Sequence, residues 1–223
     1  MYRVEDKYGC CKSDLWNLQR RLEYVMESDS NESTGEGYKI SSLYFDDLWD
    51  SCLRDTVEGY RSRRKYRIRI YNDSLQVIKL EVKEKQNNRI YKLSKSITKE
   101  EMKRLISGEP IDCLNNYNDP ATLFNLAIQT AALKPKVIVT YERKAFIYGA
   151  GNVRITLDRN IRGSNDVFRF GEKEILYNPV KENDSVLEVK YDEFMPHFIL
   201  QLLELGNMKQ TAYSKYQLCR DLF

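Results

Sequence analysis

The feature of this sequence that most constrains its fold is a pair of alternating segments, 65–71 and 77–83. Successive side chains of a β-strand point to opposite faces, so the charged residues at every second position would share one face. The Tyr, Ile, Leu and Val residues between them would share the other. Asn72, Asp73 and Ser74 have the chemistry of a turn. The two segments therefore predict an antiparallel hairpin with one charged and one apolar face.

Similar strand patterns occur throughout the chain, at 2–8, 39–45, 89–97, 137–143, 153–158 and 187–191. In the strand expected over 89–97, Tyr91, Leu93 and Lys95 would share a face. Six or more strands would each place Lys or Arg, sometimes with Glu or Asp, on one face. The repetition argues that the charged faces have a common purpose.

Helices are expected between the strands. Thr98 and Glu101 have the spacing of a capping box before a helix over 99–106. Asp119 precedes Pro120 at the first position of another helix. Ser13 is expected to cap a helix that extends to residue 25, and two more helices are expected around 198–205 and 213–222, the second with Ser214 and Lys215 at its start. Trp49 is expected in the core.

Composition indicates a soluble globular protein, with 223 residues of which 42% are hydrophobic and 31% are charged. We expect one domain, 1–223. No apolar run approaches the ~20 residues that span a bilayer, and the first residues lack the charged-then-apolar order of a secretory signal, so we expect a cytoplasmic protein. Five cysteines without a Cys-x-x-Cys pair and a single histidine, His197, leave a zinc site without ligands. The net charge is only +3, so an anion site would depend on local clustering of Lys and Arg.

Two arrangements of the charged faces are possible. A flat sheet would expose them to water, whereas a closed antiparallel barrel would turn them inward and cover its apolar outer face with helices. Like charges ~4 Å apart repel by roughly 4 kcal/mol at an effective dielectric near 20. A lumen crowded with Lys and Arg would therefore require acidic partners or a polyanion to offset this repulsion. A phosphate chain with a metal ion would meet that requirement.

The order of the motifs resembles the VTC domain of polyphosphate polymerases, within the triphosphate tunnel metalloenzymes of the CYTH-like superfamily. The resemblance spans nearly the whole chain. It rests on segments 5–8 (EDKY), 42–47 (SLYFDD), 65–71 (KYRIRIY), 80–83 (LEVK), Lys95, 140–143 (TYER), 153–158 (VRITLD), 187–191 (LEVKY) and 214–216 (SKY). It implies an α+β fold in which an antiparallel β-barrel forms a tunnel with flanking helices.

The resemblance also implies a set of site residues. Basic residues that would act in catalysis by holding phosphate groups are Arg67, Arg69, Lys83, Arg143 and Arg154. Residues that would bind phosphate or nucleotide are Lys7, Lys95, Tyr141, Lys190, Ser214 and Lys215. Glu188 would bind the metal, Mn²⁺ or Mg²⁺, and Asp158 and Lys190 could support these groups from behind.

The expected activity is an ATP-dependent polyphosphate polymerase that transfers the γ-phosphate of ATP to a growing polyphosphate chain. Two alternatives stay open: a metal-dependent tripolyphosphatase or nucleoside triphosphatase of the same fold, and a non-catalytic polyanion- or RNA-binding module with aromatic stacking platforms. The expected partners are ATP and polyphosphate, not nucleic acid. A separate membrane protein could hold the chain at the inner face of the membrane.

Overall fold

The computed structural model describes residues 4–29, 32, 35–87, 89–180, 185–203, 209–210 and 212–223. Its contacts divide the chain into two compact units. The first unit comprises residues 1–39, 141–162 and 179–213, and the second comprises 40–140, 163–178 and 214–223. The expectation of one domain over 1–223 stays a prediction. No helix among the described residues is long and apolar enough to cross a membrane.

The second unit is built on the hairpin that the alternation predicted. Strands β4 (Ser62–Tyr71) and β5 (Ser74–Gln86) pair antiparallel, and the two turn residues Asn72 and Asp73 both have positive φ. Positive φ at both central positions is the geometry of a type I′ turn, whose twist matches that of the strands. The strand order in this unit is β7-β3-β4-β5-β6, with β3 over Tyr38–Asp46, β6 over Arg89–Ile97 and β7 over Lys134–Tyr148.

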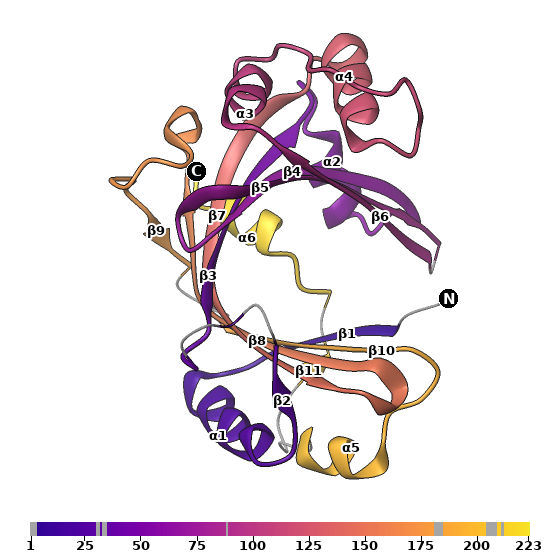
Figure 1. The fold of residues 1–223 in the computed structure, drawn as a ribbon, viewed down its shortest axis with the longest axis vertical. Helices are drawn as coiled ribbons and strands as arrows, with labels where there is room; N and C mark the ends of the chain where they lie inside the picture. Colours follow the sequence, from indigo (N-terminus) through magenta and orange to yellow (C-terminus); the bar gives the residue numbers. More distant parts are fainter. Residues whose placement is uncertain are drawn as a thin grey trace. The chain divides into compact units, whose positions relative to one another are not determined.

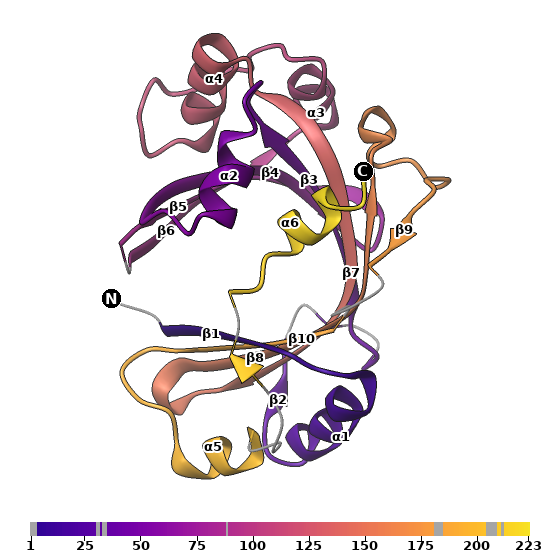
Figure 2. The same ribbon diagram turned by 180° about the vertical axis from the view of Figure 1, so that it is seen from behind.

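Helices α3 (Lys99–Ile106) and α4 (Pro120–Ala131) cover one face of β4, β5 and β6, and α6 (Lys215–Arg220) lies on the opposite face (Figures 1 and 2). The covered face is apolar: Ile68, Leu80 and Val82 are buried with Leu105 and Phe124 of the helices. Each such side chain contributes about 1.5–3 kcal/mol when it is removed from water. This burial fixes the register, so the charged residues are confined to the other face.

The helix starts of this unit follow the expected chemistry. The Thr98 side chain accepts from the backbone N–H of Glu101, and the Glu101 side chain accepts from that of Thr98, which confirms the capping box. Asp119 caps α4 before Pro120. The placement of Trp49 in the core is wrong: it precedes α2 (Ser51–Val57) and its side chain is 77% exposed, because Asp46 rather than an aromatic side chain anchors this segment.

The first unit has the strand order β11-β1-β10-β8-β7, with β1 over Val4–Gly9, β8 over Val153–Ser164, β10 over Val186–Tyr191 and β11 over Lys209–Gln210. Short strand β2 (Glu27–Ser28) pairs with β7, and β9 (Asn178–Pro179) pairs with β8. Helices α1 (Lys12–Glu23) and α5 (His197–Leu203) lie on the same side of this sheet (Figures 1 and 2). Cys11 rather than Ser13 occupies the N-cap of α1.

The core of the first unit lies under these two helices. Leu18 and Leu22 of α1 and Ile199 of α5 are buried with Ile155 and Leu187 of the sheet. The alternate residues of β8 and β10 therefore lie on the other face, as the period of a strand requires. Two 3₁₀ turns, Ala150–Asn152 and Val167–Arg169, complete the described elements. The predicted α+β fold of antiparallel strands with flanking helices is confirmed.

Candidate functional site

The polar face of the second unit carries rows of cations across β4, β5 and β6. Lys65 lies opposite Lys83, which lies opposite Lys92, and the next row joins Arg67 and Glu81. In these three strands the face holds eight basic residues and one acid: Arg63, Lys65, Arg67, Arg69, Lys79, Lys83, Lys85 and Lys92 against Glu81. Like charges directly opposite one another destabilise a sheet. A face of this composition is suited to a polyanion.

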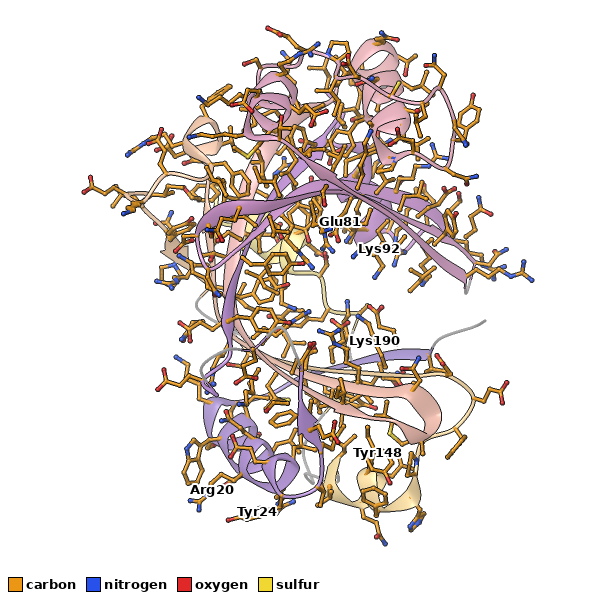
Figure 3. All side chains as sticks on the ribbon, in the orientation of Figure 1. Arg20, Tyr24, Glu81, Lys92, Tyr148 and Lys190 are labelled. Carbon is orange, nitrogen blue, oxygen red and sulfur yellow. The ribbon has the colours of Figure 1, made fainter. Side chains whose placement is uncertain are left out.

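Glu81 organises the centre of this face. Its carboxylate is 2% exposed and lies 2.6 Å from Arg67 Nε and 3.9 Å from Arg69 Nε, and it also contacts Lys92. Burial alone would raise the pKa of Glu81, but Arg67, Arg69 and Lys92 together hold it well below its usual value. Glu81 is therefore ionised at neutral pH and keeps the two guanidinium groups in place. Figure 3 shows Glu81 and Lys92 on the face away from α3 and α4.

Hydroxyl groups of β3 fix the same two arginines. Arg67 Nη1 donates to Tyr44 Oη at 3.0 Å, and Arg69 Nε donates to Ser42 Oγ at 3.2 Å. An arginine that is held on both sides loses little conformational freedom when it binds a phosphate group. The predicted pair Arg67 and Arg69 is thus brought together and pre-positioned.

The segment that enters α6 adds Ser214 and Lys215 to this unit. Lys65 Nζ donates to Ser214 Oγ at 3.0 Å, and that hydroxyl also accepts from the backbone N–H of Gln217. Tyr216 stacks on Tyr44 with ring centroids 5.0 Å apart. The carboxyl-terminal Ser-Lys-Tyr segment therefore lies on the polar face, next to the arginines of β4.

Tyr216 holds α6 against the end of β3 through a buried hydrogen bond to Asp46. Its hydroxyl donates to Asp46 Oδ2 at 2.7 Å and accepts from Arg220 Nη1 at 2.9 Å. Asp46 in turn accepts from the backbone N–H groups of Cys52 and Leu53 at the start of α2. Burial beside Asp46 raises the pKa of Tyr216, so the phenol stays protonated and remains a donor.

Among the predicted residues on β4, β5 and β6, Lys95 is the one that lies on the other face of the sheet. It lies opposite Leu80 on the apolar side of the sheet, and its Nζ is 3.2 Å from the Asp119 carboxylate that caps α4. Lys92 lies on the polar face, where the resemblance predicted Lys95. Leu93 and Ile97 are the apolar anchors of β6, and their parity with Lys95 was the signal that could have identified Lys92. Desolvation, together with Arg67 and Arg69, lowers the pKa of Lys92, while Glu81 opposes that shift.

The first unit has a polar face of a different kind. Glu188 of β10 lies between Lys7 of β1 and Thr156 of β8, and Lys190 lies between Glu5 and Arg154. Lys190 Nζ contacts Glu188 and lies 3.7 Å from Glu5, and Lys7 Nζ is 3.2 Å from Glu5. Figure 3 shows Lys190 on the face of β10 away from α5.

Two arginines of this unit are held by buried acids. Arg143 donates to both oxygens of Asp158, at 2.6 and 2.7 Å, and its guanidinium lies 5.3 Å from the centre of the Tyr141 ring. Burial would lower the pKa of Arg143, but Asp158, and to a lesser extent Tyr141 and Glu188, raise it overall. Arg154 lies 2.5 Å from Asp29. Asp158 thus orients Arg143 from behind.

The two polar faces differ in charge balance. Among the described residues of the first unit's polar face, Lys7, Arg143, Arg154 and Lys190 are matched by four acids, Glu5, Asp29, Asp158 and Glu188. The first unit brings together all the predicted residues that it contains: Lys7, Tyr141, Arg143, Arg154, Glu188 and Lys190. In the second unit Arg67, Arg69, Lys83 and Ser214 share the polar face, and Lys215 follows Ser214 at the start of α6. Sequence reasoning did not assign Lys65 and Lys92 to the site.

The residues present fit a hard divalent cation. The described part of the chain has no group of three or more His, Cys, Asp or Glu residues that could enclose a metal ion. Glu5 and Glu188, however, share one ammonium group, that of Lys190, so a cation already lies against both carboxylates. Mg²⁺ is commonly held by one or two carboxylates and completed by substrate phosphates. Glu188, with Glu5, would hold such an ion.

Comparison with known proteins identifies the family. The model of the VTC domain matches residues 2–223. The chain belongs to the VTC domain family. The match spans both units, so both polar faces belong to this VTC domain. Among proteins with curated descriptions, none matches.

Solved structures with the fold of this VTC domain have low sequence identity to it. A Bacillus halodurans protein described as a "putative adenylate cyclase" is 15% identical, with a TM-score of 0.55 over 92% of this chain and 91% of that one. A Vibrio parahaemolyticus protein with the same description is 13% identical, with a TM-score of 0.51 over 98% and 97%. A Pyrococcus horikoshii OT3 protein is 15% identical, with a TM-score of 0.50 over the whole of both chains. Likeness at this identity establishes the fold and leaves the activity to the site.

Proposed function

We propose that this VTC domain is a polyphosphate polymerase that transfers the γ-phosphate of ATP to the end of a polyphosphate chain. The observation that carries the proposal is the polar face of the second unit, where eight basic residues surround one buried acid. Such a face binds a chain of phosphates better than a single one. Membership in the VTC family and the shared fold of proteins described as adenylate cyclases support an enzyme that acts on a nucleoside triphosphate.

A protein catalyses phosphoryl transfer mainly by positioning the reacting groups and stabilising their charge. The transferred group carries negative charge on its equatorial oxygens, and the attacking and leaving oxygens lie roughly in line. Arg67 and Arg69, fixed by Glu81, Tyr44 and Ser42, present guanidinium groups to these oxygens without further rearrangement. Lys83 and Lys92 bind neighbouring phosphates. The attacking group is a terminal phosphate oxygen, so no side-chain nucleophile takes part.

The first unit supplies a second set of groups. Arg143, Arg154, Lys7 and Lys190 bind phosphate oxygens, and each is held by an acid that orients it. A bound Mn²⁺ or Mg²⁺ would neutralise charge that develops on the phosphates. Glu188 and Glu5 would hold that ion, and Lys190 would then turn from Glu188 to a phosphate. The separate membrane protein and a location at the inner face of the membrane stay predictions.

The decisive experiment incubates the purified protein with ATP and Mn²⁺ or Mg²⁺, separates the products on a gel that resolves polyphosphate, and measures ADP and free phosphate. A polyphosphate ladder with ADP is expected. Free phosphate without a ladder would contradict the polymerase and establish a hydrolase of ATP or tripolyphosphate. No turnover, with RNA bound as tightly as tripolyphosphate, would instead indicate a polyanion-binding module.

An Arg67→Ala variant should lose the ladder, because no other guanidinium on β4 is held by both Glu81 and Tyr44. Arg64→Ala is the matched control. Arg64 lies on the same strand but points to the opposite face, where it pairs with Glu84 at 3.3 Å. Equal activity of the two variants would exclude the polar face of the second unit as the active site.

A further inference from the structure

Thr156 has a buried hydroxyl group that the folded chain leaves without a partner. The residue is 2% exposed, and its Oγ1 has no hydrogen-bond partner. Buried hydroxyl groups are nearly always hydrogen-bonded, since a hydroxyl removed from water without a partner costs free energy. Valine has the same shape without that cost. A threonine in this position therefore points to a group outside the chain.

The sheet register places this hydroxyl beside the acids of the first unit. Thr156 lies directly opposite Glu188, with Arg154 and Asp158 two residues away on the same strand. Directly paired residues of an antiparallel sheet have their Cβ atoms about 4.5–5.5 Å apart on one face. Thr156 thus shares the polar face with Glu188, and the next strand beyond Glu188 supplies Lys7 and Glu5.

We propose that Thr156 Oγ1 is an oxygen ligand of the divalent cation that Glu188 and Glu5 hold. This inference rests on the proposed function, which supplies the cation. Its support is threefold: the hydroxyl has no partner, Glu188 is its neighbour across the ladder, and an ammonium group already contacts both carboxylates. Threonine and serine hydroxyls bind Mg²⁺ in other phosphoryl-transfer sites.

The charge balance of the first unit favours a cation over a phosphate oxygen as the partner of this hydroxyl. Four basic residues among the described residues of this face each lie against an acid: Lys7 against Glu5, Arg143 against Asp158, Arg154 against Asp29 and Lys190 against Glu188. A phosphate brought to such a neutral face meets four carboxylates as well as four cations. A divalent cation can replace the Lys190 ammonium group against Glu188 and Glu5, and it also has an affinity for hydroxyl oxygen.

The test measures binding of Mn²⁺ alone, followed by the electron paramagnetic resonance signal of the free ion, to the intact protein and three variants. Thr156→Val preserves the shape and removes the oxygen, Thr156→Ser preserves the oxygen, and Glu188→Gln removes the proposed carboxylate ligand. We expect Thr156→Val to weaken Mn²⁺ binding about tenfold and Thr156→Ser to stay within about threefold of the original protein. The melting temperature of metal-free Thr156→Val should be unchanged or higher, because the hydroxyl it loses has no partner.

Unchanged Mn²⁺ affinity in Thr156→Val would overturn the inference. So would a loss of tripolyphosphate affinity in EDTA with Mn²⁺ affinity intact, which would make the hydroxyl a phosphate donor. No Mn²⁺ binding by the original protein, with or without tripolyphosphate, would also overturn it. The product gel separates these results from failure of the proposed function: a ladder from the original protein, with Mn²⁺ binding lost in Glu188→Gln and unchanged in Thr156→Val, removes the Thr156 assignment alone.

Discussion

At the scale of single residues, Lys92 and Lys95 offer a direct comparison. They lie three residues apart on β6 and point to opposite faces, Lys92 to Glu81 and Lys95 to Asp119. Lys92→Ala should weaken tripolyphosphate binding about threefold to tenfold, equivalent to about 0.7–1.4 kcal/mol. A charge-assisted hydrogen bond contributes about 1.5–3 kcal/mol, and roughly half of this is expected for a half-exposed side chain. Lys95→Ala should change binding less than about twofold. Isothermal titration calorimetry in EDTA measures both, and a larger loss in Lys95→Ala would restore the assignment inferred from the family resemblance.

Glu81 gives a pH dependence of known sign. Its pKa is lower in the folded protein than its usual value of 4.5, so the stabilisation it provides is complete above that pH and declines as the pH falls below it. Glu81→Gln leaves Arg67 and Arg69 without their buried partner and should reduce the free energy of unfolding at pH 7 by about 3–5 kcal/mol. The difference between the two proteins should narrow as the pH falls below 4.5, because Glu81 then takes up a proton in the unfolded chain while it stays ionised in the folded protein.

Urea denaturation at pH 7, 5, 4 and 3 measures this difference. Glu84→Gln is the control, since Glu84 lies on the opposite face of β5 from Glu81 and its partner Arg64 is exposed. An exposed pair contributes less than about 1 kcal/mol, so this variant should stay close to the original protein at each pH. A constant gap between Glu81→Gln and the original protein from pH 7 to pH 3 would show that the Glu81 carboxylate is not the source of the stabilisation.

At the scale of elements, sequence reasoning succeeded where alternation was strong. Over 65–70 of β4 and 78–83 of β5 charged and apolar residues alternate, so the parity, the turn and the faces of Arg67, Arg69 and Lys83 could be predicted. β6 has fewer apolar anchors, and the face of Lys95 was the opposite of that implied by the family resemblance. The partners of Glu81 and Arg143 could be inferred only as a shared face, because parity gives no distances.

Contacts between residues far apart in the sequence could not be predicted. Tyr216 donates to Asp46, 170 residues earlier, and this hydrogen bond decides where α6 lies. Both residues lie in motifs of the family resemblance, 42–47 and 214–216, but no local pattern indicates that the two side chains contact each other. The exposure of Trp49 has the same cause, since the segment after β3 is held by the Asp46 carboxylate.

The α6 attachment can be tested with Tyr216→Phe. The ring and its stacking on Tyr44 are preserved, whereas the hydrogen bonds to Asp46 and Arg220 are lost. The expected cost is about 1.5–3 kcal/mol of stability, the contribution of a hydrogen bond to a charged group. Tripolyphosphate binding should weaken as well, because Ser214 and Lys215 precede the released ring. Urea denaturation and calorimetry measure the two effects.

Tyr117→Phe serves as the comparison, since Tyr117 is exposed and lies in the segment between α3 and α4. It should change neither quantity. Lower stability with unchanged tripolyphosphate affinity in Tyr216→Phe would mean that the hydrogen bond supports the fold without positioning Ser214 and Lys215.

At the scale of the whole molecule, the distribution of charge matters more than its sum. The net charge is +3, a value too small to attract polyanions strongly. Eight basic residues lie beside one acid on the polar face of the second unit, whereas Lys7, Arg143, Arg154 and Lys190 of the first unit each lie against an acid. Tripolyphosphate should therefore stabilise the protein by binding at particular residues, and chloride of equal ionic strength should not.

The size of the effect follows from linkage. A ligand at 100 times its dissociation constant stabilises the folded state by about 2.7 kcal/mol, and each kcal/mol raises the melting temperature of a chain of this length by about 2–4 °C. We expect tripolyphosphate to raise the melting temperature by about 5–10 °C. The double variant Lys83→Ala/Lys92→Ala should lose most of this rise. The double variant Lys99→Ala/Lys103→Ala changes two exposed residues of α3 and makes the same change in net charge. It should keep the rise in melting temperature. If both double variants lost the rise in melting temperature equally, tripolyphosphate binding would depend on net charge alone. The polar face would then not account for polyanion binding by this VTC domain.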